Sequence, residues 1–305
     1  MTPVIRRALP VLIAVLALAH TGCGSNSSER PTSPTGPRPQ VAGSEAQGVR
    51  AMAVAPPLGA AGSYGVVGAS TVTNTGPTVV NGDLGVSPGS AVTGFPPGTV
   101  TGTINAGNAA AANAQTAVTT AYNALTSQAC NVNLTGINLG GLTLTPGVYC
   151  FSSSAQLTGT LTLNALGNPG SVWVFQIGST LTTASGASVV FINGGQSCGA
   201  FWQVGSSATL GTTTNFSGNI LALASITANT GATSSGALFA RTGAVTLDSN
   251  VVSVVGSCGS GPQPSPTPIP GGSPTPPPVP TLPEVVTWGL LAILLAGGIL
   301  VLGRR

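Results

Sequence analysis

Charge is nearly absent from this chain of 305 residues. Only 4% of its residues are charged, against about 25% in ordinary soluble proteins, and lysine does not occur at all. Between Leu58 and Gly256 the charged residues are Asp83, Arg241 and Asp248. The surface of that region must therefore be polar through Thr, Ser, Asn and Gln. The formal net charge of +3 comes from arginines near the two ends, so the composition gives no basic patch for nucleic acid.

Titratable groups are too few for most enzyme chemistry. The single histidine is His20, and residues 58–256 contain neither histidine nor glutamate. General acid–base catalysis needs titratable groups that lie near each other, whereas Asp83 and Asp248 are far apart in sequence. The cysteines lack the spacing of metal ligands and have no histidine partner. We therefore expect no enzyme activity, no metal site and no cofactor.

What the sequence does have is a repeated pair, an apolar residue followed by threonine. The threonines of these pairs are Thr143, Thr162, Thr182, Thr209, Thr227 and Thr246. The steps between them are 19, 20, 27, 18 and 19 residues. A period near 19 is typical of a solenoid in which each coil is one repeat. Because coils stack about 4.8 Å apart, like neighbouring strands, the threonines are predicted to form one straight row.

Short apolar runs beside glycines predict the strands of these coils. Residues 147–151, 170–175 and 218–221 are examples that begin with glycine, which adopts corner conformations that other residues resist. The region before residue 90 contains four further short runs, at residues 64–67, 70–73, 78–80 and 84–86. The longest threonine step contains residues 193–198, which we expect to form an extra loop.

Residues 104–128 form the one long segment with a helical pattern. Apolar residues recur every three or four positions, as one stripe on a helix: Ala111, Ala114, Val118, Tyr122 and Leu125. Asn105 or Asn108 could cap its start. A helix of this length measures about 36 Å, which is comparable to six stacked coils. We therefore expect the helix to lie along one side of the solenoid.

The segment Gly82-Asp83-Leu84-Gly85-Val86-Ser87-Pro88-Gly89-Ser90-Ala91-Val92-Thr93-Gly94-Phe95-Pro96, the alanine-rich helix and the glycine–threonine coils carry a family resemblance. Together they closely resemble the microbial ice-binding proteins of the DUF3494 type. The resemblance covers residues 58–255. It implies a mainly β fold, a right-handed β-helix (solenoid) with one long α-helix packed alongside, and the surface of an ice crystal as the partner.

The resemblance also implies a site. Ice-binding faces of the family often carry Thr-(Ala/Gly)-X-(Thr/Asn), which Thr227-Ala228-Asn229-Thr230 matches fully and three other coils match loosely. Strand alternation puts residues i and i+3 on opposite faces, so one of the two columns must lie at a bend. The candidate ice-binding residues are Thr143, Thr162, Thr182, Ser185, Thr209, Thr212, Thr227, Thr230, Thr246 and Ser249.

Threonine suits an ice surface, which offers no charge to pair with. Its hydroxyl and methyl groups can both contact ordered water, and its β-branch restricts χ1 so that the array is ordered before binding. The alternative is that these threonines are strand formers on an inert wall. The protein would then be a structural or adhesive surface module that binds polysaccharide or other cells.

Four cysteines lie within or at the edge of residues 58–258, and an exported chain meets oxidising conditions. Four cysteines allow two disulfides in three possible connectivities, and we expect Cys130 with Cys150 and Cys198 with Cys258. Four buried free thiols are the alternative.

The N-terminal end predicts export. Residues 1–23 read as a secretory signal, with Arg6 and Arg7 before an apolar run. The segment Ala19-His20-Thr21-Gly22-Cys23 resembles a bacterial lipobox, so Cys23 is a candidate for lipidation, and ordinary cleavage nearby is the alternative. Residues 24–57 are expected to be a disordered Ser/Pro/Gly linker.

The C-terminal end predicts an anchor. A Pro-rich linker at 257–280 precedes the segment 281–305, in which residues 285–302 are apolar and about long enough to span a bilayer. Arg304 and Arg305 would place the C-terminus in the cytoplasm. Residues 279–284 resemble the IPTL-type C-terminal sorting signals, which implies a sorting protease. We expect an exported protein that is cell-surface or membrane-anchored, or secreted after processing.

Overall fold

The structure is a computed structural model that describes residues 52–256 and 258. The predicted signal segment 1–23 with Cys23, most of the 24–57 and 257–280 linkers, and the predicted anchor at 281–305 lie outside the described residues. Among the residues that are described, no helix is long and apolar enough to cross a membrane.

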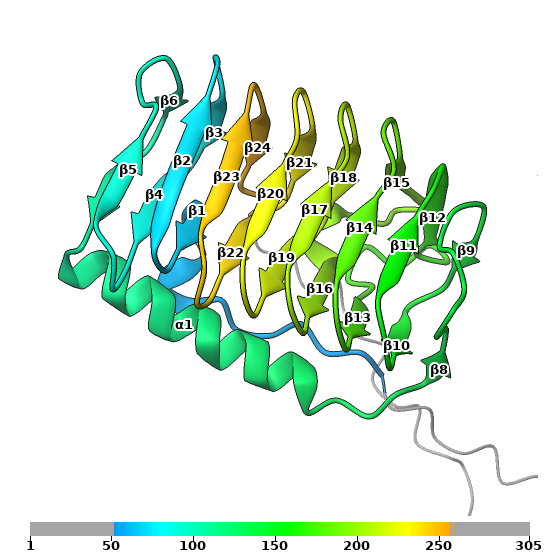
Figure 1. Cartoon of the computed structure of the whole chain (residues 1–305). Helices are drawn as coiled ribbons and strands as arrows, with labels where there is room; N and C mark the ends of the chain where they lie inside the picture. The colour runs from blue at the N-terminus through cyan, green and yellow to red at the C-terminus, as the bar shows by residue number, and fades with distance from the viewer. Residues whose placement is uncertain (1–51, 257, 259–305) are drawn as a thin grey trace, which may run out of the picture. The chain divides into compact units, whose positions relative to one another are not determined.

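The strands form three parallel sheets (Figure 1). Sheet A contains, in spatial order, β7 (Ile104–Ala106), β4 (Asp83–Val86), β1 (Tyr64–Gly68), β22 (Leu238–Ala240), β19 (Asn219–Ala222), β16 (Ala200–Val204), β13 (Trp173–Ile177), β10 (Gly147–Phe151) and β8 (Val132–Asn133). Sheet B contains β11 (Ala155–Leu157), β14 (Leu181–Thr183), β17 (Ala208–Leu210), β20 (Ile226–Ala228), β23 (Val245–Asp248), β2 (Thr71–Thr75) and β5 (Ala91–Thr93). Sheet C contains β6 (Thr99–Val100), β3 (Val79–Asn81), β24 (Val251–Ser253), β21 (Thr233–Ser235), β18 (Asn215–Ser217), β15 (Ser188–Ile192), β12 (Thr160–Asn164) and β9 (Thr143–Leu144).

The chain visits the sheets in the order A, B, C, and three such strands make one coil. In the coil of β13, β14 and β15, each strand pairs in parallel with its counterpart in the next coil, β16, β17 and β18. The strand runs predicted before residue 90 and the predicted glycine-led runs all contain strands of these coils. The expected mainly β fold with one helix is therefore confirmed.

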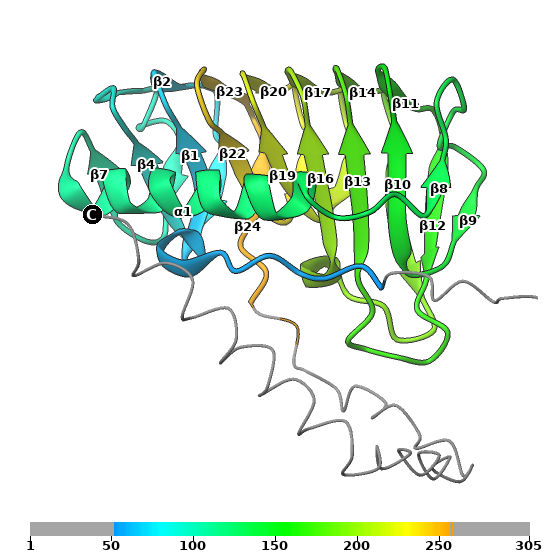
Figure 2. The ribbon, with the colours of Figure 1, turned by 90° about the horizontal axis from the view of Figure 1, so that it is seen from below.

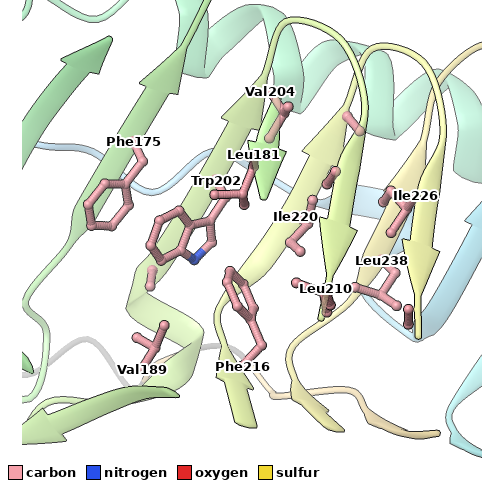
Figure 3. Close-up of a cluster of buried hydrophobic side chains, with 14 of the residues drawn as sticks. Phe175, Leu181, Val189, Trp202, Val204, Leu210, Phe216, Ile220, Ile226 and Leu238 are labelled. Carbon is pink, nitrogen blue, oxygen red and sulfur yellow. The ribbon is translucent and has the colours of Figure 1, made fainter. Parts of the chain in front are cut away.

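The core lies between the three sheets and is filled by alternate side chains of most strands, part of which Figure 3 shows. Trp173, Trp202 and Phe239 are fully buried, as their apolar runs predict. Aromatic rings stack from coil to coil, with ring centroids 3.8 Å apart for Phe175 and Trp202 and 5.5 Å apart for Tyr149 and Phe175. Parallel, in-register pairing places equivalent residues above each other, and this is why large apolar residues can form a continuous stack.

The order of the coils in space differs from their order in the sequence. The coil of β1, β2 and β3 pairs with the last coil, β22, β23 and β24, through sheet A at Val66–Leu238 and through sheet B at Thr73–Thr246. The coil of β4, β5 and β6 lies beyond it. The helix then carries the chain back along sheet A, so that β8 begins at the opposite end (Figure 1).

Helix α1 (Ala109–Thr126) is shorter than the predicted 104–128. Its predicted first turn is instead strand β7, which pairs with β4. The side chain of Asn108 caps the helix by accepting a hydrogen bond from the backbone N–H of Ala111 at 3.0 Å. The whole predicted apolar stripe is buried against sheet A, where it packs on outward-facing residues such as Phe201 and Leu221. Helix α1 therefore covers the outer face of sheet A from β7 to β16, and the loop after the helix crosses β13 and β10 (Figure 2).

Gln176, on β13, joins the end of this helix to sheet A. Its Nε2 donates to the carbonyl oxygens of Leu125 at 2.7 Å and Gln128 at 2.8 Å. The last carbonyls of a helix have no partner within the helix, and an unsatisfied buried acceptor costs about 1–3 kcal/mol.

We expect Gln176→Met to lower the free energy of unfolding by about 1–3 kcal/mol, because the carbonyls of Leu125 and Gln128 lose the side-chain donor that ties them to sheet A. Equilibrium denaturation in urea, followed by circular dichroism, measures the loss. Gln156→Met is the control, since Gln156 is exposed on β11. Equal stability of the two variants would show that Gln176 does not hold the helix end.

Residues 52–58 are an extended segment that packs along the helix end, not part of a free linker. The backbone N–H of Val54 donates to Oε1 of Gln128 at 2.9 Å, and Nε2 of Gln128 donates to the carbonyl of Val54 at 2.7 Å. The boundary predicted at residue 58 therefore comes too late. A short 3-10 turn, η1 (Gly59–Ala61), leads into β1.

Both expected disulfides are present, Cys130–Cys150 and Cys198–Cys258. The first links the segment after the helix to β10. Cys198 lies in η2 (Ser197–Gly199), at the end of the extra loop predicted at 193–198. A second long connection, residues 165–172 between β12 and β13, was not predicted.

Candidate functional site: the threonine face of sheet B

A column of six threonines runs along sheet B, whose strands lie side by side in Figure 1. The strand register pairs each one with the next, in the order Thr182, Thr209, Thr227, Thr246, Thr73 and Thr93. Gln156 occupies the same position on the edge strand β11. Neighbouring strands are about 4.8 Å apart, so the hydroxyl and methyl groups repeat at that interval.

Buried and outward-facing residues alternate along the strands of sheet B, so the threonine side chains of the column face solvent. On β14, Leu181 and Thr183 are buried while Thr182 between them is exposed. On β20, Ile226 and Ala228 are buried and Thr227 is half-buried. The inward residues fill the core between the sheets, so packing fixes which way the threonines point.

Two of the predicted threonines do not belong to this column. Thr143 and Thr162 pair with each other on sheet C, and the next residue in their row is Val190. The step of 20 residues from Thr162 to Thr182 therefore runs from sheet C of one coil to sheet B of the next. Thr182 instead lies beside Gln156. The single row predicted from regular spacing is wrong at this point because two coils contain long connections.

Two threonines of the column were missed. Thr73 and Thr93 follow Val72 and Val92, so the same apolar–threonine signal is present in the sequence. They were not assigned to the row because they precede the helix, far from the other four in sequence. Only the pairing of β2 with β23 brings them into line.

A second row lies at the bend between sheets B and C. Backbone bonds run from N–H of Gly186 to the carbonyl of Thr212 at 2.9 Å and from Thr213 to Thr230 at 3.0 Å, and the same pattern continues from Gly231 to Asp248 and from Ser249 to Thr75. This register aligns Ser185, Thr212, Thr230, Asp248 and Thr75. The residues that follow them have positive φ and turn the chain: Gly186, Thr213, Gly231, Ser249 and Gly76.

The bend explains how residues three apart can share one surface, which a straight strand forbids. It also removes Ser249 from the predicted second row, because the turn after Thr246 is one residue shorter and Asp248 takes that place. The carboxylate of Asp248 accepts hydrogen bonds from the hydroxyls of Thr230 and, at 3.1 Å, of Ser249. Its charge is thus partly satisfied within the row.

The titratable groups of the described region do not form a catalytic site. Asp248 lies at the end of β23 on sheet B, whereas Asp83 begins β4 on sheet A, where its Oδ1 accepts from the backbone N–H of Thr103 at 2.7 Å. Burial, and after it the Asp83 carboxylate, raises the pKa of the Tyr64 phenol. Within the described residues, no three His, Cys, Asp or Glu side chains are grouped to hold a metal.

The other two faces are less regular. Sheet A is covered by helix α1. Sheet C mixes chemistries: Thr162 pairs with Val190, and further along the sheet Ser217, Ser235, Ser253 and Asn81 pair in turn. Sheet B alone combines exposure with an unbroken threonine column.

Comparison with known proteins identifies the family of the chain. A family model described as "Ice-binding-like" matches residues 66–253. The "Ice-binding protein" of Nostoc sp. (strain HG1) is 54% identical over 207 residues, which cover 68% of this chain and 76% of that relative.

Two solved structures share the fold. An ice-binding protein from an Antarctic biological consortium has 45% sequence identity and a TM-score of 0.65, with 66% of this chain and 92% of that chain covered. The ice-binding protein of the Antarctic ascomycete Antarctomyces psychrotrophicus has 44% identity and a TM-score of 0.65, with 67% and 100% covered. Because the family model covers more than half of the sequence, the chain belongs to the ice-binding-like family.

Proposed function

We propose that the protein binds ice through sheet B and has no catalytic activity. The observation that carries this proposal is the in-register column of six threonines, Thr182, Thr209, Thr227, Thr246, Thr73 and Thr93. Membership of a family whose relatives are named as ice-binding proteins supports it.

The mechanism is adsorption. The threonine methyl groups exclude disordered water while the hydroxyls hold water in a repeating pattern that matches ice. Rigid χ1 angles and strands fixed by the core order this array before contact, which lowers the ordering cost of association. Adsorbed protein then blocks growth or recrystallisation of ice, or holds a cell to it. Few charged groups are present to bind water in competing orientations.

The proposed site extends to the bend, where Ser185, Thr212 and Thr230 supply a second row of hydroxyls. It includes Thr73 and Thr93. Thr143 and Thr162 lie outside it, on sheet C, and Ser249 contributes only through its bond to Asp248.

We further propose that the coils wind as a right-handed β-helix and that the protein is exported and held at the cell surface. The sequence supports anchoring through the apolar segment at 285–302 with Arg304 and Arg305, after the IPTL-like residues 279–284, or through a lipidated Cys23. A sorting protease would act at the C-terminal signal. Mass spectrometry of the mature chain from the membrane and the medium tests which end is processed.

Slow freezing tests ice binding directly. The segment 52–258 contains all described strands, the helix and both disulfides. A dilute solution of it, with an unrelated protein of similar size, is frozen slowly onto a cold surface, and both proteins are measured in ice and liquid. We expect enrichment of this protein in the ice, while the unrelated protein stays in the liquid. Exclusion of the folded protein would contradict the proposal and favour the adhesive module.

The buried aromatic residues do not favour that alternative. Sugar-binding surfaces use exposed rings, whereas Trp173, Trp202 and Phe239 are in the core.

A further inference from the structure

Both ends of the described chain run along one corner of the fold, where sheet C meets sheet A. The segment 52–58 begins beside Gln128 at the helix end and leads through η1 into β1, a strand of sheet A, and the chain leaves the fold after β24, a strand of sheet C. Residues from both ends, among them Pro57, Leu58, Val255 and Cys258, line one pocket there. We call this place the A–C corner.

Sheet B is the wall opposite the A–C corner. In Figure 2, sheet B lies at the top, and the blue segment before β1 and the orange segment after β24 lie on the other side. If the protein is attached to a surface by either end, the threonine column therefore faces away from that surface. Neither end of the described chain crosses the column.

The Cys198–Cys258 disulfide determines where tension on the C-terminal end enters the fold. Without it, a pull beyond residue 258 would act first on β24, a strand of only three residues in the middle of sheet C between β21 and β3. Peeling β24 away would break the sheet C pairing between the last coil and the coil of β1, β2 and β3, and leave only the pairing in sheets A and B to join them.

With the disulfide intact, the same pulling force is transmitted to β16, a strand with more hydrogen bonds and deeper burial. Cys198 lies directly before β16, whose five residues all pair with β13 and which is buried throughout. β16 also pairs with β19 on its other side and carries Trp202, part of the aromatic stack. A force on β16, which is buried between two strands of sheet A, is resisted by many hydrogen bonds at once. A force on β24, the last strand in the sequence, breaks its hydrogen bonds one after another.

We propose that the A–C corner is the holding point of the domain and that Cys198–Cys258 is its tension clamp. Chain tension beyond Cys258 passes through the disulfide into β16, and sheet B faces away from whatever holds the chain. This inference rests on the proposed function, since it concerns a protein that adheres to ice while held by an end.

The experiment attaches the full chain to beads by one end at a time. The sequence has no lysine, so a biotin-acceptor peptide inserted after residue 24 or after residue 260 supplies the only lysine for biotin ligation, and it is retained if the predicted signals at the two ends are removed. Detergent-solubilised protein is coupled to streptavidin beads through a photocleavable biotin link, and the beads are pressed on ice and withdrawn with a calibrated force. Fractions adhering, rupture forces and extension steps from unfolding are recorded.

We expect beads of both kinds to adhere, and adhesion to be lost with the Thr209→Tyr/Thr227→Tyr variant. If tethered protein fails to adhere but enters ice after release by light, the orientation is wrong and the proposed function stands. If released, folded protein is also excluded from ice, the proposed function itself fails.

The clamp is tested with the Cys198→Ser/Cys258→Ser variant. Pulled from the C-terminal end, it should show unfolding steps at lower force than the parent. Pulled from the N-terminal end, it should behave as the parent, which also shows that the variant folds and binds ice. If the unfolding force of the variant falls equally when it is pulled from either end, the disulfide only stabilises the fold in general. If the unfolding force does not change from either end, the disulfide does not transmit the pulling force.

Discussion

Tyrosine in place of Thr209 and Thr227 is expected to abolish the uptake of this protein into ice. These residues are neighbours in the middle of the column, one coil apart. Two rings standing out of a flat wall would separate it from the ice along several coils. Because both side chains point out of the core, the fold should be retained. Uptake during slow freezing should fall to the level of an unrelated protein.

The matched control is Thr143→Tyr/Thr162→Tyr. It makes the same chemical change at two neighbouring threonines, but on sheet C. We expect this variant to enter ice like the parent. If the sheet C variant loses uptake and the sheet B variant keeps it, ice binding occurs on sheet C. Loss in both variants, with folding intact, would mean that the site spans both faces.

Removal of the Trp202 side chain is expected to have the largest effect on stability. Trp202 is fully buried, its ring stacks on Phe175 at 3.8 Å between centroids, and its Nε1 donates to the carbonyl of Ser217 at 3.1 Å. Trp202→Ala should lower the free energy of unfolding by about 3–5 kcal/mol, because a cavity replaces these contacts. Urea denaturation, monitored by far-UV circular dichroism, measures this change.

Leu166→Ala serves as the control for Trp202→Ala, since Leu166 is 66% exposed in the connection between β12 and β13. A surface change of this kind should alter stability by less than about 0.5 kcal/mol. A loss below about 1 kcal/mol in Trp202→Ala would show that the coils do not depend on the aromatic stack. The two variants should bind ice equally while folded, because neither residue lies on sheet B.

Local patterns of the sequence predicted most of the individual elements. The stripe from Ala111 to Leu125 identified the helix because a period of three to four residues places those side chains on one face. Its start was placed five residues early, since Ile104 to Ala106 pair with β4 as a strand. Apolar residues beside glycine identified the strands of sheet A, which are buried on both faces and so lack a polar alternation.

The threonine column was predicted only in part, from the spacing of threonines along the chain. Four threonines of the column, Thr182, Thr209, Thr227 and Thr246, come from consecutive coils and were found by spacing. The spacing from Thr162 to Thr182 is almost the same, yet Thr162 lies on sheet C. Spacing alone failed here because a partial coil with a long connection has about the same length as a full coil.

From its sequence the protein is expected to have a nearly uncharged surface, β strands with outward threonines, one apolar-striped helix and four cysteines that can form two disulfides. These features depend on composition and on neighbours along the chain. Strand pairing in three dimensions was needed to show that Thr73 and Thr93 complete the column, that Thr143 and Thr162 lie on sheet C, that Cys130 pairs with Cys150 and Cys198 with Cys258, and that both ends of the described chain run along the A–C corner. Each of these depends on which strands pair, and parallel pairing joins residues distant in sequence, with a register set by burial in the common core.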